Sequence, residues 1–125
     1  FFNKETRFDF LVEKNEKKIF VEVKNVTLFR DKNTAEFPDA VTSRGSKHLL
    51  TLIDAIKKGY KSYLLFLVQI QNMEKFKIAK DIDAEYYKNY ILAKKAGVNF
   101  LAYRCNISAK KIFIDKKLKI INDWL

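Results

Sequence analysis

A chain of 125 residues that is 48% hydrophobic, with 11 Phe and 6 Tyr, can bury a sizeable core, which excludes a disordered protein. Its 25 basic residues against 15 acidic ones give a net charge of +10, which favours a polyanionic partner such as nucleic acid, unless the excess of lysine is only a compositional bias. The single cysteine, Cys105, and the single histidine, His48, exclude a disulfide framework, a cysteine-based zinc site and a histidine-rich metal site.

The first predicted element is a β-hairpin. Residues 6–12 and 18–24 alternate apolar and polar side chains with period two, and the turn-like residues 14–17 join them. We expect the odd-numbered residues of the second segment to form its buried face, because they are all apolar: Ile19, Val21 and Val23. Burying the apolar residues of both strands on one face places Phe10 opposite Val21. That register also places Asp9 directly opposite Glu22.

Two carboxylates in this position need a compensating partner. Like charges directly opposite each other destabilise a sheet, so Arg7 or Lys24, protonation of one carboxyl, or a divalent cation should offset them. Mg²⁺ is typically held by one or two carboxylates, with waters and substrate phosphate completing its shell. Asp9 and Glu22 would supply the carboxylates, and Lys24 would position a water or stabilise negative charge on a phosphate. The alternative is an ordinary solvated strand face whose charges neutralise one another.

The rest of the chain alternates helices and strands. The second strand is expected to continue through residues 25–29, and residues 30–42 to form a polar, irregular loop. Three further strands are expected at 63–68, 98–103 and 112–114, the first covered on both faces and the last at an edge. Residues 118–125 fit no single element.

Two helices are predicted from their apolar stripes and end signals. The first covers 45–58 and stops at Gly59, and the second covers 83–96 with Asp83 as N-cap and Gly97 as stop. The order β-β-α-β-α-β implies an α/β (or α+β) fold in which helices flank a mixed central sheet, in a single domain over residues 1–125.

Residues 37–48 carry a predicted phosphate site. If the helix starts near Ser43, Arg44 and His48 lie four residues apart on one flank. Together with Lys47 and the free backbone N–H groups of the helix N-terminus, they would form a phosphate receptor. His48 is alternatively a structural residue on the helix flank. Asp39 is either a third carboxylate near the metal or a turn residue after proline.

Other motifs give little support to different chemistries. The glycines at 45, 59 and 97 cannot form a glycine-rich phosphate loop, and no serine lies in a nucleophile elbow. The aromatic residues Tyr86, Tyr87 and Tyr90 could stack on bases, but helical spacing favours Tyr86 and Tyr90 as core residues.

The location of the protein is predicted from what the sequence lacks. The longest unbroken apolar run, at 63–68, is too short to span a bilayer, and no secretory signal is visible, so a cytoplasmic protein without a membrane partner is expected. The chain begins with Phe1 and enters a strand almost at once, so we expect further residues upstream.

Three blocks of sequence closely resemble the sugar fermentation stimulation protein A family. They are RFDFL at 7–11, VEVKNVTL at 21–28 and FPDAVTSRGSKHL at 37–49. Shorter matches continue at 65–69 and 96–98, so the resemblance covers essentially the whole chain.

The resemblance implies a bacterial or archaeal DNA-binding protein, associated by name with regulation of sugar (maltose) metabolism. It also implies a restriction-endonuclease-like domain of the PD-(D/E)xK type. In that pattern an Asp on one strand precedes (Asp/Glu)-x-Lys on the next, which here maps onto Asp9 and onto Glu22 and Lys24. The literal Pro38-Asp39 is not this motif, because it follows the Glu-x-Lys. The family usually carries a small OB-like domain upstream, which is expected to lie outside this chain.

The prediction is therefore a DNA-binding protein with a Mg²⁺- or Mn²⁺-dependent nuclease site that hydrolyses phosphodiesters. Asp9 and Glu22 would bind the metal, and Lys24 would assist the attacking water. Phosphate would be held by the residues of the predicted receptor: Arg44, Lys47 and His48. The alternative is a non-catalytic DNA-binding regulator of sugar (maltose) metabolism genes. A structural or protein-interaction domain would require the charge of +10 to be accidental.

Overall fold

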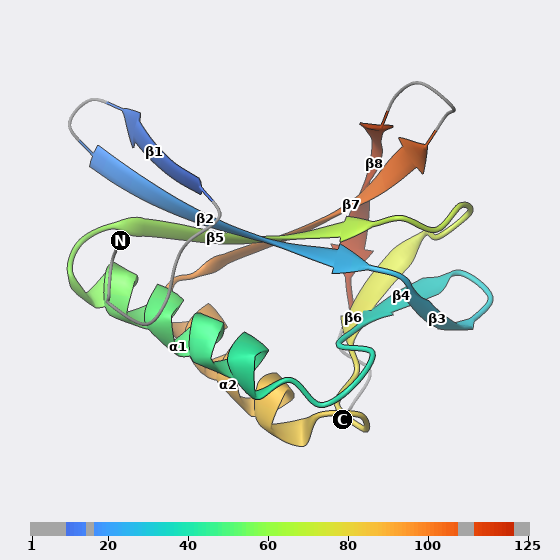
Figure 1. Ribbon diagram of the computed structural model, residues 1–125, viewed down its shortest axis with the longest axis horizontal. Coiled ribbons are helices and arrows are strands. Elements are labelled where there is room, and N and C mark those ends of the chain that lie inside the picture. Colours follow the sequence, from blue (N-terminus) through green and yellow to red (C-terminus); the bar gives the residue numbers. More distant parts are fainter. Residues whose placement is uncertain (1–9, 15–16, 108–111, 122–125) are drawn as a thin grey trace.

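The sheet and its helices follow the predicted α/β plan. The computed structural model describes residues 10–14, 17–107 and 112–121, and within them eight strands form one mixed sheet in the order β1-β2-β5-β7-β8-β6-β4-β3. Both helices, α1 (Ser43–Lys57) and α2 (Ala84–Ala96), lie on the same face of the sheet, beneath β2, β5 and β7 (Figure 1). The strands are β1 (Phe10–Lys14), β2 (Lys17–Val26), β3 (Leu28–Asp31), β4 (Thr34–Phe37), β5 (Lys61–Val68), β6 (Lys75–Ile78), β7 (Asn99–Ile107) and β8 (Ile112–Ile120).

The register of the first hairpin is confirmed. β1 and β2 pair antiparallel with Phe10 opposite Val21 and Val12 opposite Ile19. Residues 6–9 of the predicted first strand, including Asp9, lie outside the described residues. The observed pairing of Phe10 with Val21 is the register from which we predict that Asp9 lies opposite Glu22.

The prediction of which face of β2 is buried is wrong. Phe20, Glu22 and Val26 are buried on the even-numbered face, whereas Ile19, Val21 and Val23 are only half-buried. β2 carries apolar residues on both faces, so hydrophobic alternation alone does not decide which face the helices cover. The consequence is that Glu22 points towards the helix layer and away from bulk water.

The central strand β5 is covered by helices on one face only. It pairs parallel with both β2 and β7, as expected for a central strand. Its burial alternates from residue to residue, so the prediction of a strand covered on both faces is wrong. The half-buried side chains of β5 join others from β2 and β7 in an apolar surface on the opposite face: Ile19, Val21, Tyr63, Leu65, Leu101 and Tyr103.

The structure contains a second hairpin that the sequence did not predict. β2 ends at Val26, so the strand does not continue through residues 25–29, and residues 30–42 are not all irregular. β3 pairs antiparallel with β4, and β4 pairs parallel with β6, another unpredicted strand. These strands have four residues each, too few for a period to be recognised, and residues distant in the sequence hold them in place.

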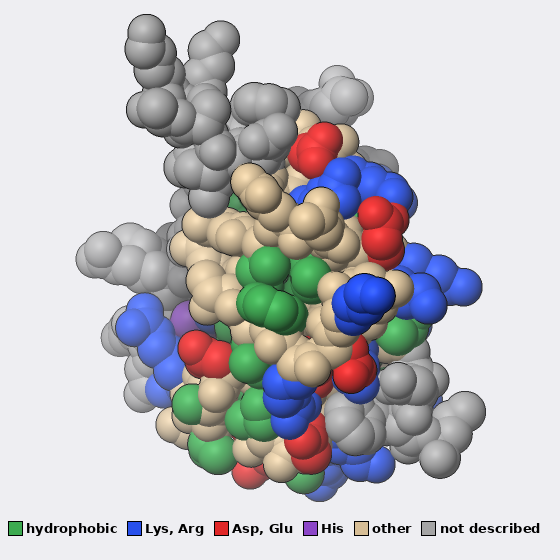
Figure 2. Space-filling model, turned by 90° about the vertical axis from the view of Figure 1, so that its right-hand side faces the viewer, with side chains coloured by type: hydrophobic (Ala, Val, Ile, Leu, Met, Phe, Trp, Pro, Cys, Tyr) green, Lys and Arg blue, Asp and Glu red, His purple; other side chains and the backbone are tan. Residues whose placement is uncertain are grey.

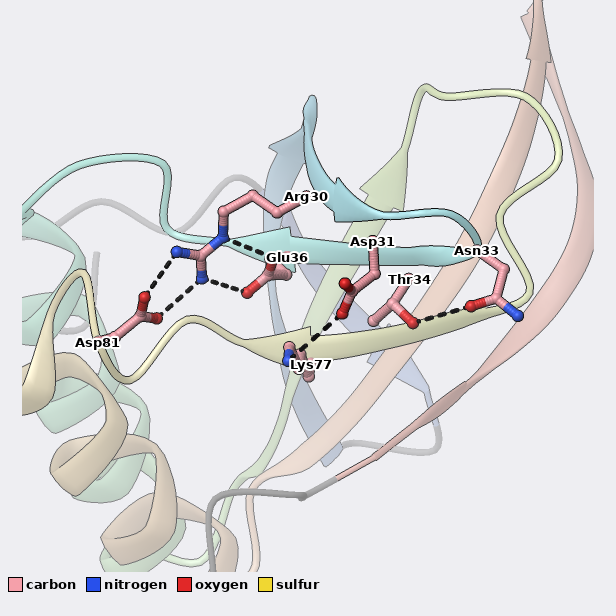
Figure 3. Close-up of polar contacts among 7 residues, drawn as sticks. All are labelled: Arg30, Asp31, Asn33, Thr34, Glu36, Lys77 and Asp81. Atoms are coloured by element: carbon pink, nitrogen blue, oxygen red, sulfur yellow. Dashed lines mark hydrogen bonds and ion pairs between the residues drawn. The ribbon is translucent and has the colours of Figure 1, made fainter.

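Arg30 ties this hairpin to the loop before α2 (Figure 3). Its guanidinium donates two hydrogen bonds to Glu36, of 2.8 and 2.5 Å, and two to Asp81, of 2.6 and 2.8 Å. Hydrogen bonds from Arg30 hold the pKa of Asp81 below its usual value, and those to Glu36 and Asp81 raise the pKa of Arg30. The Glu36 side chain is 1% exposed, so this bidentate contact neutralises a charge buried in the strand layer.

The helix ends follow the sequence signals closely. α1 starts at Ser43, two residues before the range 45–58 and at the start that the predicted phosphate receptor assumed, because Thr42 caps it by accepting a hydrogen bond from the Gly45 N–H at 2.9 Å. Gly59 follows α1 with a φ of +90°, and Gly97 ends α2 with a φ of +106°, conformations that favour glycine. Asp83 caps α2 as predicted.

At the far side of the sheet, β8 is not an edge strand. It pairs antiparallel with β7 and parallel with β6, and it takes in residues 118–120, which the sequence left unassigned. Cys105 on β7 is a buried free thiol, and burial raises its pKa.

Candidate functional site

Three predicted site residues come together between β2 and α1. The even-numbered face of β2 carries Glu22 and Lys24, and α1 presents His48 towards them. Lys24 Nζ lies 2.8 Å from His48 Nδ1 and 3.4 Å from Glu22 Oε1. His48 Nδ1 lies 3.4 Å from the same Glu22 oxygen. We call these three residues the Glu22 cluster.

His48 Nδ1 can take either of two roles in the Glu22 cluster. It accepts a hydrogen bond from the Lys24 ammonium at 2.8 Å, or, when it carries a proton, it donates one to Glu22 Oε1 at 3.4 Å, but it cannot do both. In the first role the Lys24 ammonium serves both neighbours, as donor to His48 and as counter-charge to Glu22.

The Glu22 carboxyl is ionised despite its burial. The residue is only 3% exposed, and burial raises the pKa of this carboxyl. The contacts with His48 and Lys24 lower the pKa by more, so that it lies below the usual glutamate value.

One oxygen of this carboxylate is left without a partner. Glu22 Oε2 is buried and has no hydrogen-bond partner in the part of the chain that the structure describes. An unpaired buried polar atom costs about 1–3 kcal/mol, and more when it is charged. An ionised oxygen of this kind suits a hard divalent cation. Mg²⁺, for example, is typically bound by one or two carboxylates, with waters and phosphate as its other ligands. Within the described ranges, no group of three or more His, Cys, Asp and Glu side chains is arranged to hold a metal.

The other predicted site residues that the structure describes are exposed, unlike the buried Glu22 and His48. Asp39 is exposed in the segment between β4 and α1, and the structure does not join it to Glu22 and His48 as a three-ligand group. Arg44 and Lys47 are exposed on the first turns of α1, whereas His48 is buried. The predicted phosphate receptor thus combines two exposed basic side chains with one buried histidine. Asp9, the predicted second metal ligand, lies outside the described residues.

Tyr86 is a neighbour of the site that the sequence did not assign to it. The residue is fully buried, as its helical spacing favoured, and its ring packs edge-on against Phe37 with 5.4 Å between centroids. A Cβ atom on Gly45 would lie 3.1 Å from Tyr86 Cε2, so the absence of a side chain at position 45 admits the ring. No local pattern could have revealed this neighbour, because it depends on how α2 packs against α1.

Asp83 fixes the two helix starts relative to each other. Its Oδ1 accepts a hydrogen bond from the Tyr86 N–H at 3.0 Å, and its Oδ2 accepts one from the Thr42 N–H at 2.9 Å. Thr42 is itself the cap of α1. One buried carboxylate thus joins both helix N-termini and holds Tyr86 next to the turn of α1 that leads to His48.

The surface at the β3–β4 end of the molecule carries charges of both signs. Figure 2 shows Lys and Arg side chains interspersed with Asp and Glu around a small apolar group. The excess of positive charge is therefore not gathered into a one-sign patch on this face.

Neither described helix is long and apolar enough to cross a bilayer.

Comparisons with known proteins agree with this architecture. A family model described as the sugar fermentation stimulation protein RE domain matches residues 1–111. A sugar fermentation stimulation protein homolog of Pelagibacter ubique is 80% identical over 122 residues, which is 98% of this chain and 53% of that relative. The homolog of Syntrophotalea carbinolica is 46% identical over 121 residues, 97% of this chain and 51% of that relative. The chain thus spans about half the length of the curated relatives it matches.

A solved structure has the same fold. It is Pyrococcus furiosus SfsA in complex with Ca²⁺, with a TM-score of 0.86 and 29% identity over 94% of this chain and 51% of that one. The nuclease-like α/β fold implied by the sequence resemblance is thereby confirmed. Given the match of the family model to residues 1–111, the chain belongs to the sugar fermentation stimulation protein family.

Proposed function

We propose that this chain carries a divalent-metal-dependent nuclease site that hydrolyses phosphodiesters in DNA. The observation that carries the proposal is the Glu22 carboxylate, which is buried and ionised and has one oxygen without a partner. If the Glu22 carboxylate served only to neutralise Lys24, we would expect both of its oxygens to accept hydrogen bonds from nearby donors. An unpaired charged oxygen is costly to bury, and a cation would remove that cost.

The chemistry of the donors fits Mg²⁺ or Mn²⁺. Glu22 Oε2 would be one ligand, and Asp9 remains the predicted second, because the observed pairing of Phe10 with Val21 is the register from which it was placed. A bound dication supplies Lewis-acid stabilisation of a phosphate and lowers the pKa of a water molecule. The relative from Pyrococcus furiosus was solved in complex with Ca²⁺, another hard dication, which supports this choice.

The remaining residues have roles that follow from their positions. The Lys24 ammonium would stabilise negative charge on the phosphate, and His48 Nδ1 holds that ammonium in place by accepting its hydrogen bond. Arg44 and Lys47, exposed at the start of α1, would contact backbone phosphates of DNA and so position it. The net charge of +10 supports a polyanionic substrate.

Cleavage assays on the full-length protein test this proposal. Plasmid and oligonucleotide DNA are incubated with Mg²⁺ or Mn²⁺ and then with EDTA. We expect cleavage that requires the metal and falls by roughly 10²–10³-fold or more in Glu22→Gln and Lys24→Met. Glu85→Gln, an exposed carboxylate on α2, is the matched control and should keep full activity. Cleavage that survives in Glu22→Gln would overturn the proposal.

The second candidate function is DNA binding without cleavage. It is favoured by the 3.4 Å contact between Lys24 and Glu22 Oε1, which offsets much of the carboxylate charge without a metal. A regulator of this kind would retain DNA in a salt-sensitive manner, with or without EDTA, and would leave it intact.

A further inference from the structure

Two buried polar side-chain atoms lack a hydrogen-bond partner among the described residues. They are Glu22 Oε2 and the hydroxyl of Tyr86, whose residue is 0% exposed. A phenylalanine at position 86 would fill nearly the same volume without the cost of burying an unpaired hydroxyl. One atom is an acceptor and the other can donate, so a small polar ligand could satisfy both.

Two sets of contacts connect the Tyr86 ring with the elements that carry the Glu22 cluster. On one side the ring contacts Phe37, which packs 5.5 Å from Phe66, the β5 residue paired with Lys24 in the sheet. On the other side it approaches Gly45 of α1, three residues before His48. The ring therefore packs against the sheet beside Lys24 and against the turn of α1 that leads to His48.

Electrostatics supports this proximity. Burial is the main cause that raises the pKa of the Tyr86 hydroxyl far above its usual value, and the negative charge of Glu22 is the next. Asp83 and Tyr90 contribute less. The phenol and the Glu22 carboxylate are therefore within electrostatic reach of each other.

We propose that Tyr86 is a positioning residue of the Glu22 site, whose hydroxyl and Glu22 Oε2 hold one water molecule between them and so fix the carboxylate for a divalent cation. The hydroxyl donates to the water, the water donates to Oε2, and the remaining lone pair of Oε2 faces the cation. A water with two or more polar partners is a normal part of a protein interior. The inference rests on the proposed metal site, and it deepens that proposal by naming what orients its ligand.

Calcium binding to the full-length protein tests the inference without requiring activity. Ca²⁺ is titrated into the wild type and Tyr86→Phe by isothermal calorimetry, and the thermal unfolding of both is measured in EDTA. Groups that orient a metal ligand are worth roughly 10–100-fold in metal affinity, so Tyr86→Phe should bind Ca²⁺ at least about 10-fold more weakly. Its unfolding temperature without metal should fall only slightly, because the variant keeps the buried ring and loses a single water-mediated hydrogen bond.

Tyr90→Phe is the matched control. Tyr90 lies one turn later on α2, is also buried, and packs 4.6 Å from Phe100 instead of at the Glu22 cluster. This variant should bind Ca²⁺ as the wild type does. A Tyr86→Phe variant that binds Ca²⁺ normally would overturn the role of Tyr86 and leave the nuclease proposal standing. If the wild type binds no Ca²⁺, or Glu22→Gln binds it equally well, the metal site itself fails and the inference falls with it.

Discussion

Asp83 offers a sharp test of how the two helices are held at the site, because one carboxylate does two separable things. It caps α2 through the Tyr86 N–H at 3.0 Å and binds the Thr42 N–H of the α1 cap at 2.9 Å. We predict that Asp83→Asn destabilises the protein by about 1.5 kcal/mol and Asp83→Ala by about 2.5 kcal/mol.

The magnitudes follow from which oxygens each variant keeps. Asparagine retains one acceptor for the Tyr86 N–H, but its NH₂ group cannot accept from Thr42. The Thr42 N–H is partly buried, and leaving it unpaired costs about 1–3 kcal/mol, with the lower half of that range expected for partial burial. Alanine loses the cap as well, which adds about 1 kcal/mol.

Urea unfolding followed by circular dichroism measures both values, provided that the dependence of the unfolding free energy on urea stays that of the wild type. The exposed neighbour Glu85→Gln is the control and should change the free energy of unfolding by less than about 0.5 kcal/mol. Equal losses in Asp83→Asn and Asp83→Ala, or no loss in either, would refute the reasoning.

Three further predictions use other parts of the molecule. Arg30→Met should cost about 3 kcal/mol in urea unfolding, because it leaves the buried Glu36 charge unpaired, whereas Asp81→Asn should cost less than about 1 kcal/mol; equal costs would contradict the assignment. Because the folded pKa of Glu22 lies below the ordinary glutamate value of 4.5, its contribution to stability is present above that pH and is lost as the pH falls through the folded value. In EDTA, Glu22→Gln should therefore show a flatter acid limb of stability than the wild type, and an unchanged limb would count against the ionised carboxylate. Arg44→Ala should weaken DNA binding and reduce the slope of log affinity against log salt concentration by about 1, the value for one phosphate contact. An unchanged slope would exclude Arg44 from the DNA contact.

The parts of the fold that the sequence predicted are those set by local chemistry. Asp83 and Gly97 bound α2 because a cap oxygen and a left-handed glycine act on adjacent residues. The pairing of Phe10 with Val21 follows from matching two alternating segments across a short turn. Glu22, Lys24 and His48 were chosen for their chemistry, and the structure brings these three together.

The parts that the sequence missed depend on distant contacts. β3 and β4 are too short to show a period, and Arg30 holds them through Asp81, 51 residues away in the sequence. The buried face of β2 differs from the predicted one, because both faces carry apolar residues and only the packing of the helix layer decides which face is buried. Tyr86 joins the site through the packing of α2 on α1, which no local pattern records.

Anomalous diffraction from a crystal of the full-length protein soaked in Mn²⁺ tests the central claim most directly, because it locates the ion without needing a substrate. We expect an ion at about 2.2 Å from Glu22 Oε2, with Lys24 still beside Oε1. An ion bound only elsewhere, or no ion while Glu22 keeps its contacts with Lys24 and His48, would contradict it.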